Sequence, residues 1–575
     1  MTTHIRLAAG RVRFAAVGIV ALSLVAAGCS SAGSSSGASG SSGDSPTQSS
    51  TAALGKVDYN PQPYDNLKDG GTYTTAGSFS GDDTQGLPWN VNTSLTGQRI
   101  WNWYNPVAIT FSPTGEVQVN KDYYTDATAR TEGSKQVVTL TINPKATYND
   151  GTPIDWRSIE STWKVSNGSD KNYQIGSTKG WDQIESVTRG KDDRQAVVTF
   201  SAPYTAWPAL FANFINPKAA TVSNFNNGYS NKLEPQWGAG PFTVQSYDPN
   251  SKKIVFIRNP KWWGRTGKLD KRIYLDYPSS QASINAFKNG QLDYTTAGTA
   301  EAVNEIKGVP GTEVRQGGSP FQYSLFLNAK SPVLTDVNVR HAVLAAVDRK
   351  QIADIQFQGL NYTEPLPGSV LYYSFQKGYE DNISKVLTSG SSEASEILDK
   401  AGWKAGSNGI RSKDGKQLAI TYILYSDDAI SKATAASFAA AEKKAGINVT
   451  VKTIDDAQWA TTINGGKFDA IVSGNRSMDP YGSFSLSDFY GSKTESNITG
   501  VGTAQLDRKI KEVNAIADPA EQVKKASEVE REGLSLYGQL PLYSGPSTYG
   551  VKKGLANVGA TLLYSSLPET IGWQK

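Results

Sequence analysis

The sequence predicts an α/β fold in which short strands alternate with helices. In the clearest unit, an apolar run, Leu418–Leu424, precedes an Ala-rich helix that ends at Gly446. Asp427 or Asp428 can cap this helix. Alternating apolar residues then predict a second strand: Ile447, Val449 and Val451. A helix that connects two strands in this way joins a parallel pair, so the segment is a βαβ unit.

Further strands are predicted where β-branched and apolar residues form short runs. These runs are Val137–Ile142, Lys253–Arg258, Leu292–Tyr294 and Phe468–Val472. The aromatic segment Trp101–Tyr104 also fits a strand, on which Trp101 and Trp103 would share one face. We therefore expect mixed sheets, and the 575 residues are enough for two or three domains.

Three further helices are predicted from capping residues and apolar spacing. Asp155 can cap a helix over Trp156–Trp163, and a second helix, Ser283–Lys288, stops before an Asn-Gly pair. The longest spans Val337–Ile355 and follows Asp336, which stands at the N-cap position. Its apolar residues recur at the three- and four-residue spacing of one buried face: Val339, Ala342, Val343, Ala346 and Val347.

Residues 1–28 predict an export signal. Arginines precede a 15-residue apolar run, Phe14–Gly28, which is shorter than the roughly 20 residues that cross a bilayer. Small residues stand directly before Cys29, the only cysteine in the chain. This arrangement resembles the lipobox of bacterial lipoproteins, in which the cysteine is lipidated after cleavage, although Ala26 stands where that box prefers leucine. The alternative is an ordinary secretory signal with a chance cysteine.

Residues 29–55 predict a flexible tether. Ser30–Leu54 is nearly all Ser, Gly, Ala and Thr and carries one charge, Asp44. Such a segment cannot bury enough apolar surface to fold, and as a coil it would span roughly 25–30 Å. With acyl chains on Cys29, it would hold a globular body at the outer face of the membrane.

The composition excludes several kinds of site. Without the signal, His341 is the only histidine, so no zinc site with several His or Cys ligands can form. A Ser-His-Asp or Cys-His site would need this same residue. No Gly-Lys pair is followed by Ser or Thr, so a Walker A loop is absent. We expect no metal, no cofactor and no enzymatic activity.

The charge argues against a nucleic-acid partner. Removing the signal takes away three arginines and no acid, which lowers the net charge from +4 to +1. That value leaves no basic surface for a phosphate backbone. The 13 Trp and 27 Tyr instead favour aromatic contacts with a ligand. Nothing indicates an oligomer, and we expect a monomer.

Five sets of motifs follow one another between residues 148 and 543. They are Tyr148–Trp156; Gly238–Phe242 with Arg258–Trp263; Asn289–Asp293; Asn328 with Asp336–Ala342 and Val347–Arg349; and Phe468-Asp469 with Asp479-Pro480 and Leu540–Tyr543. In this order they resemble the family 5 extracellular solute-binding proteins, the oligopeptide- and dipeptide-type receptors of ABC importers. Most of these motifs can also be explained by folding alone. Arg340, Asp348 and Arg349, for example, could form an ion-pair cluster on the surface.

The resemblance implies a two-lobed, hinged α/β fold of the periplasmic-binding-protein type (type II), with an extra subdomain on lobe I. In this chain, the two lobes and the subdomain would follow the predicted signal and tether. Lobe I takes 56–90, 223–319 and 535–575, the extra subdomain 91–222, and lobe II 320–534. A ligand would bind between the lobes, and closure would remove its water and strengthen each polar contact.

The function implied by the resemblance is that of a membrane-anchored extracytoplasmic receptor. It would capture an oligopeptide or a similar small solute and deliver it to the permease of an ABC importer. Three alternatives remain open: an oligosaccharide ligand, a sensor that needs no permease, and a surface glycoside hydrolase that uses two of the 53 acidic residues.

The ligand contacts are predicted from one family element and from aromatic residues. In peptide-binding members, an aspartate four residues before the proline of a D-x-x-D-P element receives the peptide's ammonium group. Here Arg476 stands at that position, and Asp479 matches only the second acid, so a carboxylate or a neutral ligand is favoured. The other candidates are Trp237, Tyr323, Asn475, Trp103 and Tyr104.

Overall fold

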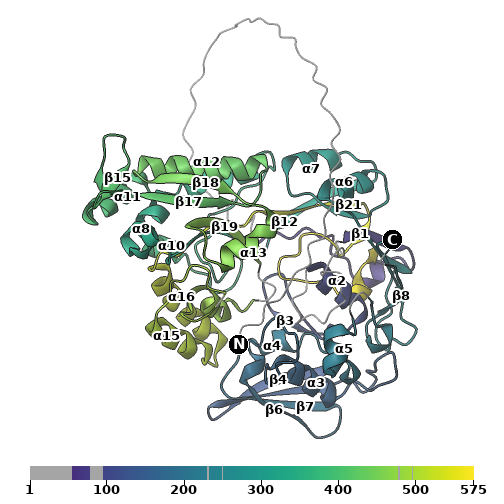
Figure 1. The fold of residues 1–575 in the computed structure, drawn as a ribbon. Coiled ribbons are helices and arrows are strands. Elements are labelled where there is room, and N and C mark those ends of the chain that lie inside the picture. Colours follow the sequence, from purple (N-terminus) through teal and green to yellow (C-terminus); the bar gives the residue numbers. More distant parts are fainter. Residues whose placement is uncertain (1–54, 78–94, 230–231, 249, 477–479, 495) are drawn as a thin grey trace, which may run out of the picture. The chain divides into compact units, whose positions relative to one another are not determined.

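The computed structural model describes residues 55–77, 95–229, 232–248, 250–476, 480–494 and 496–575 (Figure 1). The predicted signal, most of the predicted tether with Cys29, and Asp479 lie outside these residues. The three largest sheets of the described chain have seven, five and four strands. No helix within the described ranges has the length and apolar character needed to cross a bilayer.

The first large sheet has seven strands in the order β12-β21-β11-β1-β10-β9-β8. Helices α6 (Ser280–Lys288) and α7 (Ala300–Ile306) pack on one face, and α2 (Leu95–Tyr104) packs on the other. We call this unit the seven-stranded domain. Its strands are β1 (Thr72–Gly77), β8 (Phe242–Asp248), β9 (Lys253–Arg258), β10 (Lys271–Asp276), β11 (Tyr294–Thr296), β12 (Thr312–Gly318) and β21 (Pro546–Lys552).

The second large sheet has five strands in the order β18-β17-β19-β13-β20. It contains the predicted βαβ unit, because β17 and β18 are parallel and α12 (Ala429–Lys444) connects them. Asp428 caps that helix by accepting from Ser431 N, which confirms the second of the two predicted caps. We call this unit the five-stranded domain. Its strands are β13 (Phe321–Leu327), β17 (Ala419–Leu424), β18 (Asn448–Thr453), β19 (Ala470–Arg476) and β20 (Gln539–Tyr543).

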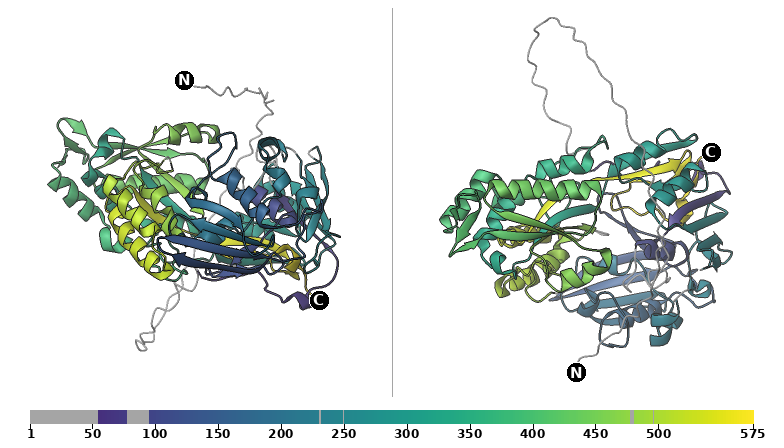
Figure 2. Two further views of the ribbon diagram at one scale, coloured as in Figure 1. Left: turned by 90° about the horizontal axis from the view of Figure 1, so that it is seen from below. Right: turned by 45° about the horizontal axis from the view of Figure 1, so that its top comes forward.

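The four-stranded subdomain lies in the chain between β1 and β8 and has the strand order β4-β5-β7-β6. These antiparallel strands are β4 (Tyr124–Glu132), β5 (Lys135–Ile142), β6 (Ile184–Arg189) and β7 (Gln195–Phe200). Helix α3 (Trp156–Ser166) packs against β6 and β7, and Asp155 caps it as predicted. Figure 2 shows the blue strands of this subdomain beside the yellow-green helices of the five-stranded domain.

The remaining elements are short or cover the two large sheets. The helices are α4 (Trp207–Leu210), α5 (Val222–Asn227), α8 (Val337–Ala346), α9 (Arg349–Phe357), α10 (Ile383–Val386), α11 (Ser391–Lys400), α13 (Asp456–Asn464), α14 (Leu486–Tyr490), α15 (Ala504–Asn514) and α16 (Pro519–Leu534). The strands are β2 (Ile109–Phe111), β3 (Val117–Val119), β14 (Lys404–Ala405), β15 (Arg411–Lys413), β16 (Lys416–Gln417), β22 (Leu555–Ala556) and β23 (Gly572–Trp573).

The chain crosses between the two large sheets twice. One crossover joins β12 to β13 at residues 319–320, and the other joins β20 to β21 at residues 544–545. Gly545 has a φ of +81°, a left-handed conformation that glycine adopts without steric cost. Two short connections between well-packed sheets are the usual form of a hinge between domains.

Two predictions of secondary structure were wrong. Trp101–Tyr104 is the end of helix α2 and not a strand. On this helix the side chains of Trp101 and Trp103 do not share a face, and they pack in two separate cores. The predicted helix Val337–Ile355 is two helices, since α8 ends at Ala346 and Asp348 caps α9 by accepting from Gln351 N. The apolar residues continue at helical spacing through Val347, so the pattern did not indicate this break.

Two predicted strands are shifted along the chain. β11 starts at Tyr294 instead of Leu292, and β19 starts at Ala470 instead of Phe468. Leu292 and Phe468 are buried in turns that precede their strands, so their apolar character reflects packing and not pairing. By contrast, the predicted strand Lys253–Arg258 is confirmed.

The predicted surface ion-pair cluster of Arg340, Asp348 and Arg349 was also wrong. Arg340 is buried, and its guanidinium donates to the carbonyl oxygens of Leu536 and Leu334. Arg349 donates to the carbonyl oxygen of Pro367. These guanidiniums therefore tie helices to neighbouring loops, and neither pairs with a carboxylate within the described chain.

Candidate functional site

The carboxyl ends of the parallel strands meet at the edges where the chain crosses between the two large sheets. β1, β10 and β11 are parallel, and β12 runs in the same direction because β11 and β12 are both antiparallel to β21. In the other sheet, β17, β18 and β19 are parallel, and β13 is antiparallel to β19. The first crossover leaves the carboxyl end of β12 and enters the amino end of β13, so both sets of carboxyl ends border it. Open α/β sheets bind ligands beyond these ends, which locates the candidate site.

Stacked aromatic rings stand on both sides of the crossovers. In the five-stranded domain, the rings of Tyr323 and Tyr543 stack with their centroids 4.8 Å apart, and Phe321 lies 4.9 Å from Tyr323. In the seven-stranded domain, Tyr294 and Tyr549 stack at 4.9 Å. Phe321, Tyr323, Tyr294 and Tyr549 are only half-buried, so part of each ring is free to contact a ligand.

A carboxylate holds the second crossover. Glu364 accepts from the backbone N–H groups of Ser544, at 2.5 Å, and Gly545, at 3.0 Å, and from the hydroxyl of Tyr362. Burial raises the pKa of Glu364, and these hydrogen bonds oppose that rise. The first crossover is held in a similar way, because the Tyr373 hydroxyl donates to the carbonyl oxygen of Pro320 at 2.6 Å. One loop, 360–375, therefore fixes both crossovers.

Three of the predicted ligand contacts come together at this site. Tyr323 lies on β13, and Asn475 and Arg476 are the last two residues of β19, where they oppose Gln322 and Phe321. Asn475 is exposed. The carboxyl end of β19 thus brings Asn475 and the backbone of Arg476 to the edge that borders the crossovers.

The other three described candidates lie in packed surroundings. Trp103 and Tyr104 are 5% and 0% exposed, and their rings contact Phe242 and Phe256 in the core beneath the seven-stranded sheet. Trp237 is half-buried and contacts Tyr229 at 5.3 Å. The structure therefore separates these three rings from Tyr323 and the end of β19.

A second set of contacts connects the four-stranded subdomain with the five-stranded domain. Lys179 pairs with Asp488 at 2.9 Å, and the Thr205 hydroxyl donates to Gln522 Oε1 at 2.6 Å. The rings of Tyr204 and Phe484 are 4.5 Å apart. None of these residues lies near a crossover along the chain, so the contacts can form or break when the hinge moves.

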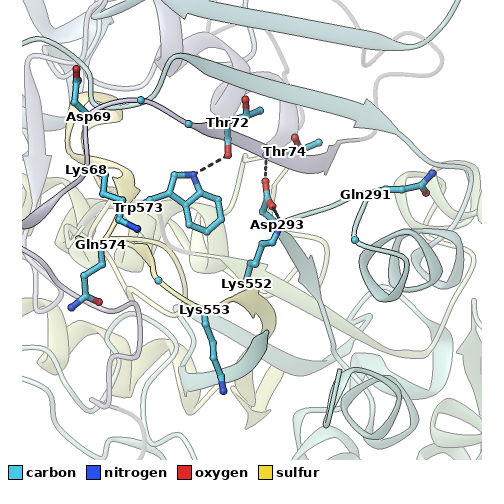
Figure 3. Close-up of a pocket in the computed structure, with 14 residues that line it drawn as sticks. Lys68, Asp69, Thr72, Thr74, Gln291, Asp293, Lys552, Lys553, Trp573 and Gln574 are labelled. Carbon is cyan, nitrogen blue, oxygen red and sulfur yellow. Dashed lines mark hydrogen bonds and ion pairs between the residues drawn. The ribbon is translucent and has the colours of Figure 1, made fainter. Parts of the chain in front are cut away.

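A surface pocket of about 540 Å³ opens at the opposite edge of the seven-stranded sheet (Figure 3). Trp573 lies in its wall and donates through Nε1 to the carbonyl oxygen of Thr72, the first residue of β1. Asp293, just before β11, accepts from Thr74 N and pairs with Lys552 at 3.2 Å. Because the pocket borders the amino ends of β1 and β11, it is remote from the crossovers and is not the candidate site.

The chemistry of the site is that of binding. No group of three or more His, Cys, Asp or Glu side chains in the described ranges could hold a metal ion. His341 stacks on Tyr537 at 3.9 Å on the surface of the five-stranded domain, and burial lowers its pKa. Sequence reasoning missed Tyr294, Tyr549 and Glu364, because only the register of distant strands brings them to the crossovers.

The relatives of the chain agree with this fold. Residues 126–497 match the model of the bacterial extracellular solute-binding proteins, family 5. The oligopeptide-binding protein OppA of Mycobacterium tuberculosis is 33% identical over 543 residues, which cover 92% of this chain and 90% of OppA.

Two solved structures have the same fold. A periplasmic EDTA-binding protein, EppA, has a TM-score of 0.80 and 22% identity, and the match covers 91% of this chain and 99% of that one. The oligopeptide-binding protein AppA from Bacillus subtilis, solved with a nonapeptide, has a TM-score of 0.72 and 18% identity over 88% of this chain and all of AppA. The predicted two-lobed periplasmic-binding-protein fold is therefore confirmed. The chain belongs to the family 5 bacterial extracellular solute-binding proteins, so it is an extracytoplasmic solute receptor and not an enzyme.

Proposed function

We propose that this receptor captures an oligopeptide or a similar small solute between its two large domains and delivers it to the permease of an ABC importer. The observation that carries the proposal is the pair of strand edges beside the two crossovers, each of which bears a pair of stacked tyrosines with at least one half-buried ring. The similarity to OppA over 92% of the chain supports a peptide as the ligand.

We propose that the lobes follow the boundaries that the sequence predicts, except the last one. Lobe I was predicted to comprise 56–90, 223–319 and 535–575 with the extra subdomain 91–222, and lobe II to comprise 320–534; because β20 (Gln539–Tyr543) pairs in the five-stranded sheet, we move the last border to the crossover at 544–545. The crossovers at 319–320 and 544–545 coincide with the two borders between lobes or lie near them. Closure about these crossovers would enclose the solute and exclude water, which strengthens the polar contacts.

Within this cleft, the proposed ligand contacts are Tyr323, Asn475 and Arg476, with Asp479 in the following loop. The proposed anchor is a lipidated Cys29 at the start of the Ser/Gly-rich tether, which would keep the protein on the outer face of the membrane. Mass spectrometry of the mature N-terminal peptide, and loss of membrane association in Cys29→Ser, would test the anchor.

The binding proposal is tested by native mass spectrometry of the purified protein, followed by calorimetry with the peptides that it carries. We expect reversible 1:1 binding, no turnover of the peptide and compaction in solution scattering. Arg476→Ala should weaken binding about tenfold or more, as loss of a charge-assisted hydrogen bond does, and should leave the melting temperature nearly unchanged. If the protein carries oligosaccharides and rejects peptides, then the solute class is wrong although the receptor function stands.

A further inference from the structure

Two arginines lie on one side of the seven-stranded sheet, and neither has an acidic partner among the residues that the structure describes. Arg272 lies on β10 and Arg99 lies on α2, the helix that packs on this face of the sheet. Both guanidiniums influence the pKa of Tyr73, which burial raises and the two positive charges lower. Arg272 lies 4.1 Å from the centre of this ring, and Ile100, the residue after Arg99, packs in the same core as Tyr73, so both arginines lie at one side of the sheet.

Arg272 is the buried member of the pair, at 2% exposed. Its Nη1 donates to the carbonyl oxygens of Tyr73 and Ile273, and its Nη2 donates to the Thr75 hydroxyl at 2.6 Å. Its guanidinium lies 3.7 Å from the ring centre of Tyr274. Its Nε–H has no acceptor, and no described carboxylate lies within ion-pair distance of this side chain. The positive charge is thus only partly compensated by neutral groups.

Arg99 is the accessible member. Its side chain is exposed, whereas the next residue of α2, Ile100, packs in the core against which Tyr294 and Tyr549 lie. Burial acts to lower its pKa, but Tyr294, Tyr549, Tyr274 and Tyr73 outweigh this effect and raise it. The groups that influence the pKa of Arg99 are therefore tyrosine hydroxyls, which are uncharged near neutral pH, and none of the ion pairs found in the described chain includes this arginine.

The acid nearest to this cluster has its own partners. Asp293 adjoins Tyr294 in the chain, but its carboxylate accepts from Thr74 N at 2.8 Å and pairs with Lys552 at 3.2 Å. That pair belongs to the pocket at the amino ends of the strands (Figure 3). Arg99 and Arg272 consequently make an excess of positive charge beside the stacked rings of Tyr294 and Tyr549.

An unpaired guanidinium in a partly desolvated wall favours a bound anion. The planar fork of arginine matches a carboxylate through two parallel hydrogen bonds, and such bonds gain strength when water is excluded. A second cation behind the first increases the attraction for a negative charge. The half-buried faces of Tyr294 and Tyr549 supply flat apolar surface beside that charge.

We propose that Arg99, supported by Arg272, binds a carboxylate of the captured solute on the lobe I side of the cleft. This inference rests on the proposed function, since it assumes a solute between the domains. For a peptide, the carboxylate is either the C-terminal group or an acidic side chain. Arg99 makes the direct contact, and Arg272 positions Tyr73 and Tyr274 and adds positive charge.

The test uses three pools of random tetrapeptides and the full mature protein. The first pool has free C-termini and no acidic residue, the second has amidated C-termini and no acidic residue, and the third is amidated with one Glu in each peptide. Wild-type protein, Arg99→Gln and Arg99→Lys are compared by affinity selection and calorimetry. Arg508→Gln is the matched control, because Arg508 is also an exposed helical arginine, on α15 of the other domain.

We expect wild-type protein to prefer a carboxylate-bearing pool by about 10- to 100-fold over the second pool, as loss of a charge-assisted contact predicts. Preference for the first pool identifies the C-terminus, and preference for the third identifies an acidic side chain. Arg99→Gln should abolish the preference, Arg99→Lys should keep part of it, and Arg508→Gln should not change it. The melting temperature of Arg99→Gln should match the wild type, because the exposed side chain of Arg99 makes no hydrogen bond within the described ranges.

Equal retention of all three pools, or a preference that survives in Arg99→Gln, would overturn this inference and leave the receptor function intact. Failure of wild-type protein to retain any pool would instead reject the peptide as ligand, and with it the peptide carboxylate. The two failures are therefore distinguishable.

Discussion

Glu442 shows how one buried side chain can control the pH dependence of stability. It lies on α12, is 0% exposed, and neither of its carboxylate oxygens has a hydrogen-bond partner. Burial raises its pKa well above the usual range. The folded protein then binds a proton that the unfolded chain releases, so stability falls as the pH rises above about 4.5.

Glu442→Gln should therefore stabilise the protein at alkaline pH. The uncharged amide avoids the cost of a buried carboxylate, and we expect a gain of about 1–3 kcal/mol at pH 8 and little change at pH 5. Urea unfolding at the two pH values measures this difference. Glu512→Gln, on the exposed surface of α15, is the control and should leave both values unchanged. A variant with the wild-type pH slope would show that another group is responsible.

Single residues also mark the limit of sequence reasoning about the site. Arg476 could be proposed as a contact because it stands in a family element, and Tyr323 because it belongs to an aromatic segment. Arg99, Tyr294 and Tyr549 could not, because their proximity depends on the register of β1, β10, β11 and β21, which no local pattern encodes. Trp103 illustrates the opposite error, since a ring suited to a ligand is buried in a core.

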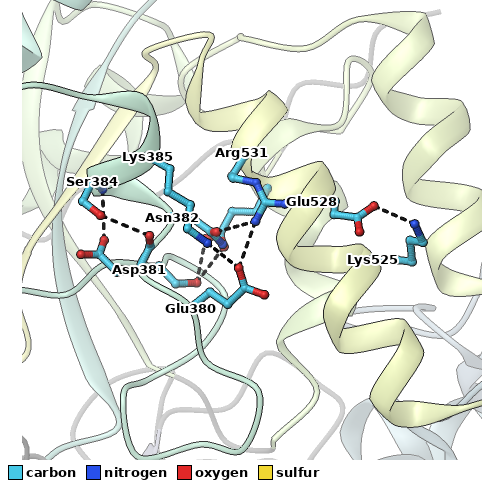
Figure 4. A network of polar contacts seen from close by, with 10 residues as sticks. Glu380, Asp381, Asn382, Ser384, Lys385, Lys525, Glu528 and Arg531 are labelled. Atoms are coloured by element: carbon cyan, nitrogen blue, oxygen red, sulfur yellow. Dashed lines mark hydrogen bonds and ion pairs between the residues drawn. The ribbon is translucent and has the colours of Figure 1, made fainter.

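At the scale of elements, a buried carboxylate attaches helix α16 to the loop 369–382. Glu530 is fully buried and accepts from Val370 N at 2.6 Å, the Asn382 amide at 2.6 Å and the Ser369 hydroxyl at 2.8 Å. Burial raises its pKa to about 7, although these donors oppose the shift. Arg531 extends the attachment by donating to Asn382 and pairing with Glu380 (Figure 4).

Glu530→Ala should destabilise the protein by about 3 kcal/mol, since it leaves buried donors of the loop unpaired. Chemical denaturation measures the loss, and hydrogen exchange should show faster exchange at residues 370–371. Glu528→Ala on the same helix removes only the exposed pair with Lys525 and should leave the midpoint nearly unchanged. Equal midpoints for the two variants would contradict the proposed attachment.

Elements with strong local signals were predicted well, and their boundaries less well. The βαβ unit around α12 and the Asp155 cap of α3 follow from periodicity and capping chemistry. The break between α8 and α9 could not be predicted, because Val347 continues the apolar stripe of the helix although its backbone is extended. Tertiary packing decides such positions, which is why Leu292 and Phe468 looked like strand residues.

At the scale of the molecule, two kinds of contact join the two halves. The crossovers are covalent and are fixed by Glu364 and Tyr373. The contacts between the four-stranded subdomain and the five-stranded domain are not covalent, and Phe484 is their apolar centre because it packs in the subdomain's core. A receptor whose closed state is populated only in part binds with an apparent affinity reduced by that fraction.

Phe484→Ala should therefore weaken solute binding by about tenfold without touching the candidate ligand contacts, because it makes the closed state less populated. Calorimetry measures the affinity, and solution scattering should show a larger radius of gyration at subsaturating solute. Phe489→Ala is the matched control, since Phe489 lies on α14, directly after the 3-10 turn Gly482–Ser485 that holds Phe484, and packs against the core of the five-stranded domain. If Phe489→Ala weakens binding as much as Phe484→Ala, then general destabilisation and not the interdomain contact explains the loss. Lys179→Ala should have a smaller effect than Phe484→Ala, because its ion pair with Asp488 is partly solvent-exposed.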